Sequence, residues 1–237
     1  PVLIALGVVC GVAGWLLLRR GGSDLRVGRL LAAAPRRTLE EAVAVAARGE
    51  EAYVRLHGRI GSDEEFPGED GKPLVYRRRR LQHRVSNEWR TFDDERLAVP
   101  FHLGDKGQRV MVDVDALGDG LVVVPRESEG VLGDVTEEAV SGPLPDLPPE
   151  TPVRLRVEQV SAVAHATAAG VPRPGPQGTV VLGPGLGRPL LLTTLDQEEA
   201  MRVLGNDRRS QLLIAAVLLA AAPIAFVLGS LAVILGL

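Results

Sequence analysis

Two long apolar runs lie at the two ends of the chain, and shorter patterns alternate between them. The first run covers residues 2–18 without a charged residue and ends at Arg19 and Arg20. The second run, residues 212–237, is also uncharged. A helix needs about 20 apolar residues to cross a hydrocarbon core of about 30 Å. The two runs therefore predict two transmembrane helices, at residues 2–18 and 212–237.

The first run has two alternative interpretations. A cleaved signal peptide usually carries a basic start and a small-residue cleavage site, but no Lys or Arg precedes this run. A lipoprotein signal would use Cys10, which follows Val9 rather than a small residue. An uncleaved anchor fits these residues better than either alternative.

Arginines flank the inner ends of both runs, and none flanks the outer ends. They are Arg19, Arg20, Arg26, Arg29, Arg36 and Arg37 after the first run, and Arg202, Arg208 and Arg209 before the second. Positive residues favour the cytoplasmic side of a membrane. We therefore expect an integral membrane protein with two spans, in the plasma membrane, with residues 19–211 in the cytoplasm and both termini outside.

Helical patterns continue after the first run. Residues 23–35 place Leu25, Leu30 and Leu31 at helical spacing before Pro35, and residues 37–50 follow with a second helical pattern. In the second pattern, Thr38 and Glu41 have the spacing of a capping box, and Gly49 is a natural stop. Residues 19–49 are therefore predicted to form a helical juxtamembrane segment.

From residue 50 the apolar period shortens to two, which is typical of strands. Strand patterns occupy residues 52–60, 96–105, 108–117, 120–127, 153–166, 178–184 and 188–195. Residues 125–152 are acidic and rich in proline, which predicts a linker or long loop, and a short capped helix is expected within residues 193–205. The predicted fold class is α+β: a β-rich, antiparallel or barrel-like domain over residues 50–205, with short helices at both ends and a transmembrane helix on each side.

Four consecutive arginines, Arg77, Arg78, Arg79 and Arg80, lie within another strand pattern. Alternation places Arg77 and Arg79 on one face of the strand and the other two on the opposite face. Acidic residues precede and follow the run: Glu64, Glu65, Glu69, Asp70, Asp93, Asp94 and Glu95. Cross-strand ion pairs are the simplest interpretation, and docking of a partner or of anionic lipid head groups is the alternative.

The composition excludes some classes of partner and some kinds of site. The net charge of −3 argues against a dedicated polyanion binder, so no nucleic acid is expected. Aromatic residues make up 3% of the chain, so the core must consist of Leu, Val and Ala. Cys10 is the single cysteine, which excludes a disulfide within the chain and a cysteine-based zinc site.

Motifs of catalysis are absent from the sequence. No phosphate-binding loop or Gly-x-Ser-x-Gly pattern occurs. The four histidines, His57, His83, His102 and His165, show no helical pair at metal-ligand spacing, although two or three could converge from neighbouring strands. Asp113 and Asp115 are expected on a solvent face, and Trp89 and Phe101 in the core or covering an edge, with ligand stacking as the alternative. We expect no catalytic, cofactor-binding or metal residue.

The order of several segments resembles that of the MULAN/GIDE family of membrane-bound ubiquitin ligases. The similar segments are residues 53–60, 74–84 with Glu88 and Trp89, Val99–Leu103, 110–117 and 178–204, in that order between the two apolar runs. The resemblance implies the family's "beside a membrane" domain. That family carries a zinc-binding RING after its second span; this sequence ends at Leu237 and has no cysteines for one, so it resembles the RING-less prokaryotic type.

The resemblance and the lack of catalytic motifs favour a non-enzymatic, membrane-anchored binding, scaffold or sensor module. It is expected to have no ubiquitin-ligase activity of its own, although the family name would suggest one. Its partners would be the lipid bilayer and an unidentified protein, with no cofactor. The alternative is a membrane-bound enzyme, such as a hydrolase, in which His57, His102 and Asp113 converge in one pocket.

Overall fold

The structure is a computed structural model, which describes residues 2–86, 88–136, 139–196, 199, 216–217 and 219–223. The chain divides into two units. One consists of Pro1–Ala33 with Gln197–Leu237, and the other consists of Ala34–Asp196. All the strands in the described residues belong to the second unit.

The first unit contains α1 (Val2–Ala33), a single helix of 32 residues. The sequence predicted that a membrane span would end at Leu18 and a separate helix would follow. Instead, α1 continues through Arg19 and Arg20, so the apolar run is the first part of a longer helix of mixed composition. Across the described residues, no helix combines the length and the apolar character that crossing a bilayer requires.

This finding contradicts several predictions that rested on two spans. The predicted fold class is wrong because it placed a β-rich domain between two transmembrane helices. The predicted plasma-membrane localisation, with residues 19–211 in the cytoplasm, is wrong for the same reason. Of the second predicted span, residues 212–237, only residues 216–217 and 219–223 are described, as helix, and the rest of that prediction lies outside the described residues. The helix predicted within residues 193–205 lies mostly outside them too.

The second unit begins with α2 (Leu39–Ala47), where the predicted capping box is confirmed. The Glu41 backbone N–H donates to Thr38 Oγ1 over 3.1 Å, and the Thr38 backbone N–H donates to Glu41 Oε2 over 2.8 Å. The second hydrogen bond is the main cause that lowers the pKa of Glu41. Leu39, Ala42 and Ala46 are buried in the domain core, so α2 packs against the β-rich domain.

Replacing Thr38 with alanine should lower the free energy of unfolding by about 1 kcal/mol, because one backbone N–H of the first turn loses its acceptor. Urea denaturation followed by circular dichroism would measure the change. Thr38→Ser keeps the hydroxyl and serves as the matched control, with little expected loss. Equal stability of the alanine and serine variants would show that the cap contributes nothing.

Five strands close into a ring in the order β1-β5-β6-β11-β10, and β10 pairs with β1 again. Their bounds are β1 (Val54–Gly61), β5 (His102–Asp105), β6 (Gln108–Val112), β10 (His165–Pro174) and β11 (Val180–Gly183). All neighbours are antiparallel except β6 and β11. Numbered along the ring's own strands, the order is 1-2-3-5-4 with a parallel 3–5 pair, which is the topology of an OB-fold.

Short strands extend the ring at β10 and complete its core. Here β12 (Leu191–Thr193) pairs with β10, and β7 (Leu121–Val122) pairs with β12. Alternate residues of β1 point inward and are buried, as the predicted period-two pattern requires. The core consists mostly of Leu, Val and Ala, with Phe101 fully buried among them.

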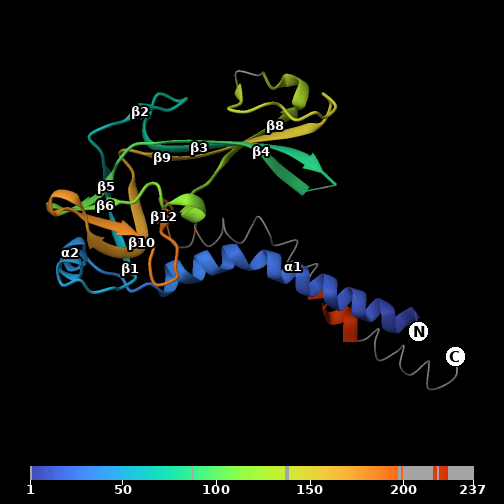
Figure 1. Cartoon of the computed structure of the whole chain (residues 1–237), viewed down its shortest axis with the longest axis horizontal. Coiled ribbons are helices and arrows are strands. Elements are labelled where there is room, and N and C mark those ends of the chain that lie inside the picture. The colour runs from blue at the N-terminus through green and yellow to red at the C-terminus, as the bar shows by residue number, and fades with distance from the viewer. Residues whose placement is uncertain are drawn as a thin grey trace. The chain divides into compact units, whose positions relative to one another are not determined.

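A second sheet is inserted into the ring's connections (Figure 1). It contains β2 (Phe66–Pro67), β3 (Pro73–Val85), β4 (Glu88–Ala98), β8 (Arg126–Val131) and β9 (Pro152–Ser161). Strands β3 and β9 pair over most of their length, β4 flanks β3, and β8 flanks β9. The predicted linker at residues 125–152 therefore contains a strand and a 3-10 turn, Leu132–Asp134.

Candidate functional site

The four consecutive arginines lie in the middle of β3, and three of them form ion pairs. Arg79 pairs with Glu95 on β4 over 3.0 Å, and Arg80 pairs with Glu158 on β9. Arg77 is half-buried, and no ion pair connects it to another described residue. The predicted cross-strand ion pairs are thus present, whereas nothing tests the docking of a partner or lipid at these residues.

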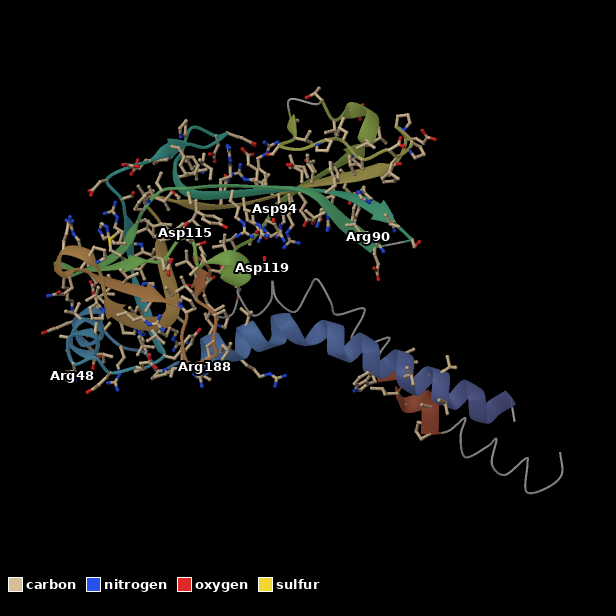
Figure 2. All side chains as sticks on the ribbon, viewed as in Figure 1. Arg48, Arg90, Asp94, Asp115, Asp119 and Arg188 are labelled. Carbon is tan, nitrogen blue, oxygen red and sulfur yellow. The ribbon has the colours of Figure 1, made fainter. Side chains whose placement is uncertain are left out.

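Arg78 has the most buried side chain of the run, with 7% of it exposed. Its Nε and Nη2 donate to the two carboxylate oxygens of Asp94 over 2.8 and 2.7 Å, and its Nη1 donates to Asp119 Oδ1 over 2.7 Å. Asp94 and Asp119 lie on the same side of the β3–β4 ribbon (Figure 2). Because Asp119 lies in the 3-10 turn Gly118–Gly120 just before β7, Arg78 connects the second sheet to the strands of the ring. Its hydrogen bonds are the main cause that lowers the pKa of both aspartates.

Further pairs continue across the same sheet. Arg154 and Arg156 on β9 both pair with Glu127 on β8 over 3.3 Å. The guanidinium of Arg154 lies 4.7 Å from the ring centre of Trp89. Trp89 on β4 therefore contacts a side chain of β9, which lies beyond β3 in the sheet. Phe101 is confirmed as a core residue. The positive charges of this sheet are largely neutralised within the protein.

An open groove of 1180 Å³ lies on the outer face of the ring, over β1, β5 and β6. It is lined by positively charged side chains from four segments and by three of the four histidines. These residues are Arg36, Arg37, Arg59, Lys106, Arg109, His57, His102 and His165. Three carboxylates of the described residues, Glu41, Glu65 and Asp105, also line the groove, so its positive side chains outnumber its acidic ones by five to three. A second groove of 590 Å³ adjoins it and shares Ser62, His102, Gln108 and Arg109 with it.

Strand register explains how residues from distant parts of the sequence meet in this groove. Arg59 on β1 lies opposite His165 on β10 and opposite Gly104 on β5, and Gly104 lies opposite Arg109 on β6. Directly paired residues of neighbouring strands share a face. These four residues therefore form one transverse row on the outer face of the ring, which we call the basic row.

The histidines lie around the basic row. The rings of His57 and His165 are nearly parallel, with centres 6.0 Å apart, and His57 Nδ1 lies 3.1 Å from Thr167 Oγ1. His102 is half-buried between the two grooves. Burial is the main cause that lowers its pKa, and Arg109 acts in the same direction while Asp63 opposes it. A lowered pKa favours a neutral imidazole at neutral pH.

The cations of the groove differ from those of the second sheet in their partners. Arg37 pairs with Glu41 over 3.2 Å. In contrast, within the described ranges, Arg36, Arg59, Lys106 and Arg109 have no carboxylate within ion-pair distance. Their side chains are all exposed. The groove therefore presents positive charge that the described residues leave unpaired.

The hydrolase alternative required His57, His102 and Asp113 in one pocket, and among the described residues only the two histidines of this set line the groove. Ser62 and His102 line it together, but Ser62 Oγ is 2.6 Å from the carbonyl oxygens of Glu64 and Pro100, so its proton is directed away from an imidazole. Asp113 does not line the groove; it accepts a hydrogen bond from the Ala116 backbone N–H. Among the described residues, no three His, Cys, Asp or Glu side chains are placed to hold a metal ion.

Sequence reasoning considered His57, His102 and His165 but did not identify Arg59, Gly104 or Arg109. The alternation in residues 52–60 places His57 and Arg59 on one face of β1, which was a usable signal. The residues that face them belong to β5, β6 and β10, more than 40 residues away, and no local pattern predicts that pairing.

Comparisons of this chain with protein families, with characterised proteins and with solved structures yielded no match. The resemblance to the MULAN/GIDE family therefore remains a prediction, and the groove has to be interpreted from its own chemistry.

Proposed function

We propose that the protein is a non-catalytic binding module that holds an anionic ligand in the groove over β1, β5 and β6. The observation that carries this proposal is the contrast between two sets of arginines. Arg78, Arg79 and Arg80 of the second sheet have carboxylate partners within the protein. In contrast, Arg59 and Arg109 on the ring have none among the described residues. Unpaired cations in a concave surface attract anions and raise their local concentration.

The topology of the ring supports the same proposal, by analogy only. OB-folds bind extended ligands over the face of their second and third strands, which correspond here to β5 and β6. A fold does not imply a function, so the argument rests on the charges of the groove. Binding is favoured over hydrolysis because Ser62 and Asp113 are engaged in backbone hydrogen bonds.

Reversing one charge of the basic row should weaken the binding of an anion at least about tenfold, equivalent to about 1.4 kcal/mol. The change is Arg59→Glu, and the probes are fluorescein-labelled polyglutamate and a labelled oligothymidylate at low ionic strength. Fluorescence anisotropy measures the affinity, which should fall as salt is added because exposed charges are screened.

Arg90→Glu is the matched control, since Arg90 is exposed on β4 in the other sheet (Figure 2). It makes the same change in net charge outside the groove and should leave the affinity unchanged. If both substitutions weakened the affinity for the probes equally, the effect would depend on net charge alone. The absence of any binding to either probe would defeat the proposal.

A further inference from the structure

Gly104 occupies the centre of the basic row and has no side chain to fill it. Its neighbours in the row are Arg59 on one side and Arg109 on the other. Neighbouring strands lie about 4.8 Å apart, so the α-carbons of the two arginines are about 10 Å apart. A gap of this size between two long cationic side chains leaves room for a small anionic group above Gly104.

The space above Gly104 is open. The three atoms nearest to a β-carbon added at Gly104 would be Cδ2 of His102 at 3.7 Å, Nε2 of His102 at 3.8 Å and the Arg59 carbonyl oxygen at 3.8 Å. These are ordinary van der Waals distances. The neighbouring row is different, because a β-carbon at Gly61 would lie 2.7 Å from His102 Nε2. The imidazole of His102 therefore packs over Gly61 and leaves Gly104 uncovered.

We propose that a phosphoryl group binds above the backbone of Gly104. Arg59 and Arg109 would bind it from the two sides, and His102 would be its third ligand. This inference rests on the proposed function and names the chemistry of the ligand. The ligand class is a phosphate monoester or free phosphate, which share the same terminal group.

The number of donors around Gly104 favours phosphate over carboxylate. A guanidinium presents a planar fork of N–H donors that matches a carboxylate or a phosphate, and a carboxylate has only two oxygens, which one fork can occupy. A phosphate monoester has three terminal oxygens, so it can accept from two forks and from an imidazole N–H at the same time. Arginine is also the residue best suited to bidentate phosphate recognition.

A steric block tests this phosphoryl-binding site without removing any charge. Gly104→Leu places a branched side chain where the phosphoryl group would lie, and the first atom of that side chain meets only ordinary contacts. Isothermal titration calorimetry with inorganic phosphate and with ribose 5-phosphate should show at least a tenfold loss of affinity for both. Gly142→Leu is the matched control, because a β-carbon there meets nothing within 4 Å and Gly142 is outside both grooves.

A second variant, Arg109→Gln, removes one lateral ligand and keeps most of the side-chain volume, and it should also weaken phosphate binding at least tenfold. Thermal unfolding of each variant checks that the fold is retained. If Gly104→Leu unfolds, retention of full phosphate affinity by a folded Arg109→Gln would still overturn the inference. Tighter binding of ribose 5-phosphate than of inorganic phosphate would identify an ester as the ligand, and equal binding would identify free phosphate.

The outcomes separate this inference from the proposed function. Equal affinity for malonate and phosphate would overturn the proposed phosphoryl-binding site. An unchanged phosphate affinity in Gly104→Leu would overturn it too. If labelled polyglutamate then still bound in an Arg59-dependent manner, the module would remain an anion-binding one. A protein that binds neither phosphate, malonate nor polyglutamate would overturn both.

Discussion

Replacing Arg78 with methionine is expected to lower the free energy of unfolding by about 2–3 kcal/mol. The substitution leaves Asp94 without the two hydrogen bonds that satisfy its carboxylate, and it removes the connection to Asp119. Breaking one partner of a fully buried ion pair costs about 3–5 kcal/mol, and a lower value is expected here because 86% of the Asp119 side chain is exposed. Methionine keeps the unbranched apolar stem of the side chain and removes the guanidinium, so the effect reports mainly on the charge and the hydrogen bonds.

The neighbouring residue of the same strand provides the control. Arg79 pairs with Glu95, and both side chains are more exposed than that of Arg78, at 25% and 39%. Arg79→Met should therefore cost no more than about 1 kcal/mol. A double-mutant cycle of Arg78→Met with Asp94→Ala, measured by urea denaturation, isolates the pairwise term. A coupling energy near zero would show that Arg78 stabilises the protein only through its packing.

The acid limb of the stability curve should change with the same substitution. Arg78 lowers the pKa of Asp94 and of Asp119 in the folded protein. The resulting stabilisation is fully present above the unfolded-state pKa of about 3.9 and is lost as the pH falls through the lower folded-state values. The difference in stability between the natural protein and Arg78→Met should therefore be largest near neutral pH and shrink below about pH 4. A difference that stays constant down to pH 2 would contradict this account.

Local features of the fold were predictable from the sequence because each depends on neighbouring residues. The capping box of Thr38 and Glu41 needs only two residues at fixed spacing, and it is present at the start of α2. The alternation that places Arg78 and Arg80 on one face of β3 needs only a strand of period two. The acidic partners expected for this run, Asp94 and Glu95, come from β4, the strand that follows directly.

The order of the strands in the ring and the position of the groove were not predictable, since both depend on which strands become neighbours. Closure of β1 against β10 brings Arg59 opposite His165, across more than 100 residues of sequence. Gly104 gave no signal of its own, because a glycine in a strand pattern more often marks a turn or a bulge. Its place between Arg59 and Arg109 follows only from the register of three strands.

Composition misled the prediction in two segments of the second unit. Residues 125–152 were interpreted as a linker because of their proline and acidic content, yet β8 pairs with β9 there along six residues. No strand pattern was predicted for residues 167–177, but β10 continues to Pro174 and pairs with β11 through Pro172 and Pro174. In the second segment the pairing with a neighbouring strand outweighs the local preference of proline for loops. In the first segment, β8 itself contains no proline, so the prolines around it hid a short strand.

Replacing Gly120 with alanine is expected to destabilise the protein by about 3 kcal/mol, at the upper end of the cost of overpacking. A β-carbon at Gly120 would lie 1.9 Å from the carbonyl oxygen of Leu190, and 3.0 Å from its carbonyl carbon. The contact is with backbone rather than with the end of a flexible side chain, so one of the two segments has to move. Leu190 is fully buried in the core and precedes β12, which pairs with β7 directly after Gly120. Movement of either segment therefore disturbs the core and the pairing of these two strands.

Gly142→Ala is the control, because a β-carbon there meets nothing within 4 Å. A Gly-to-Ala change at a position of ordinary backbone conformation reduces the freedom of the unfolded chain and stabilises by about 0.4–1 kcal/mol. That contribution is similar for both glycines, so the difference between the two variants isolates the clash with Leu190. Urea denaturation gives both free energies, and an unchanged dependence on urea would show that both variants expose a similar surface on unfolding. Equal stability of the two variants would mean that β7 and β12 do not approach each other as closely as the contact of Gly120 with Leu190 requires.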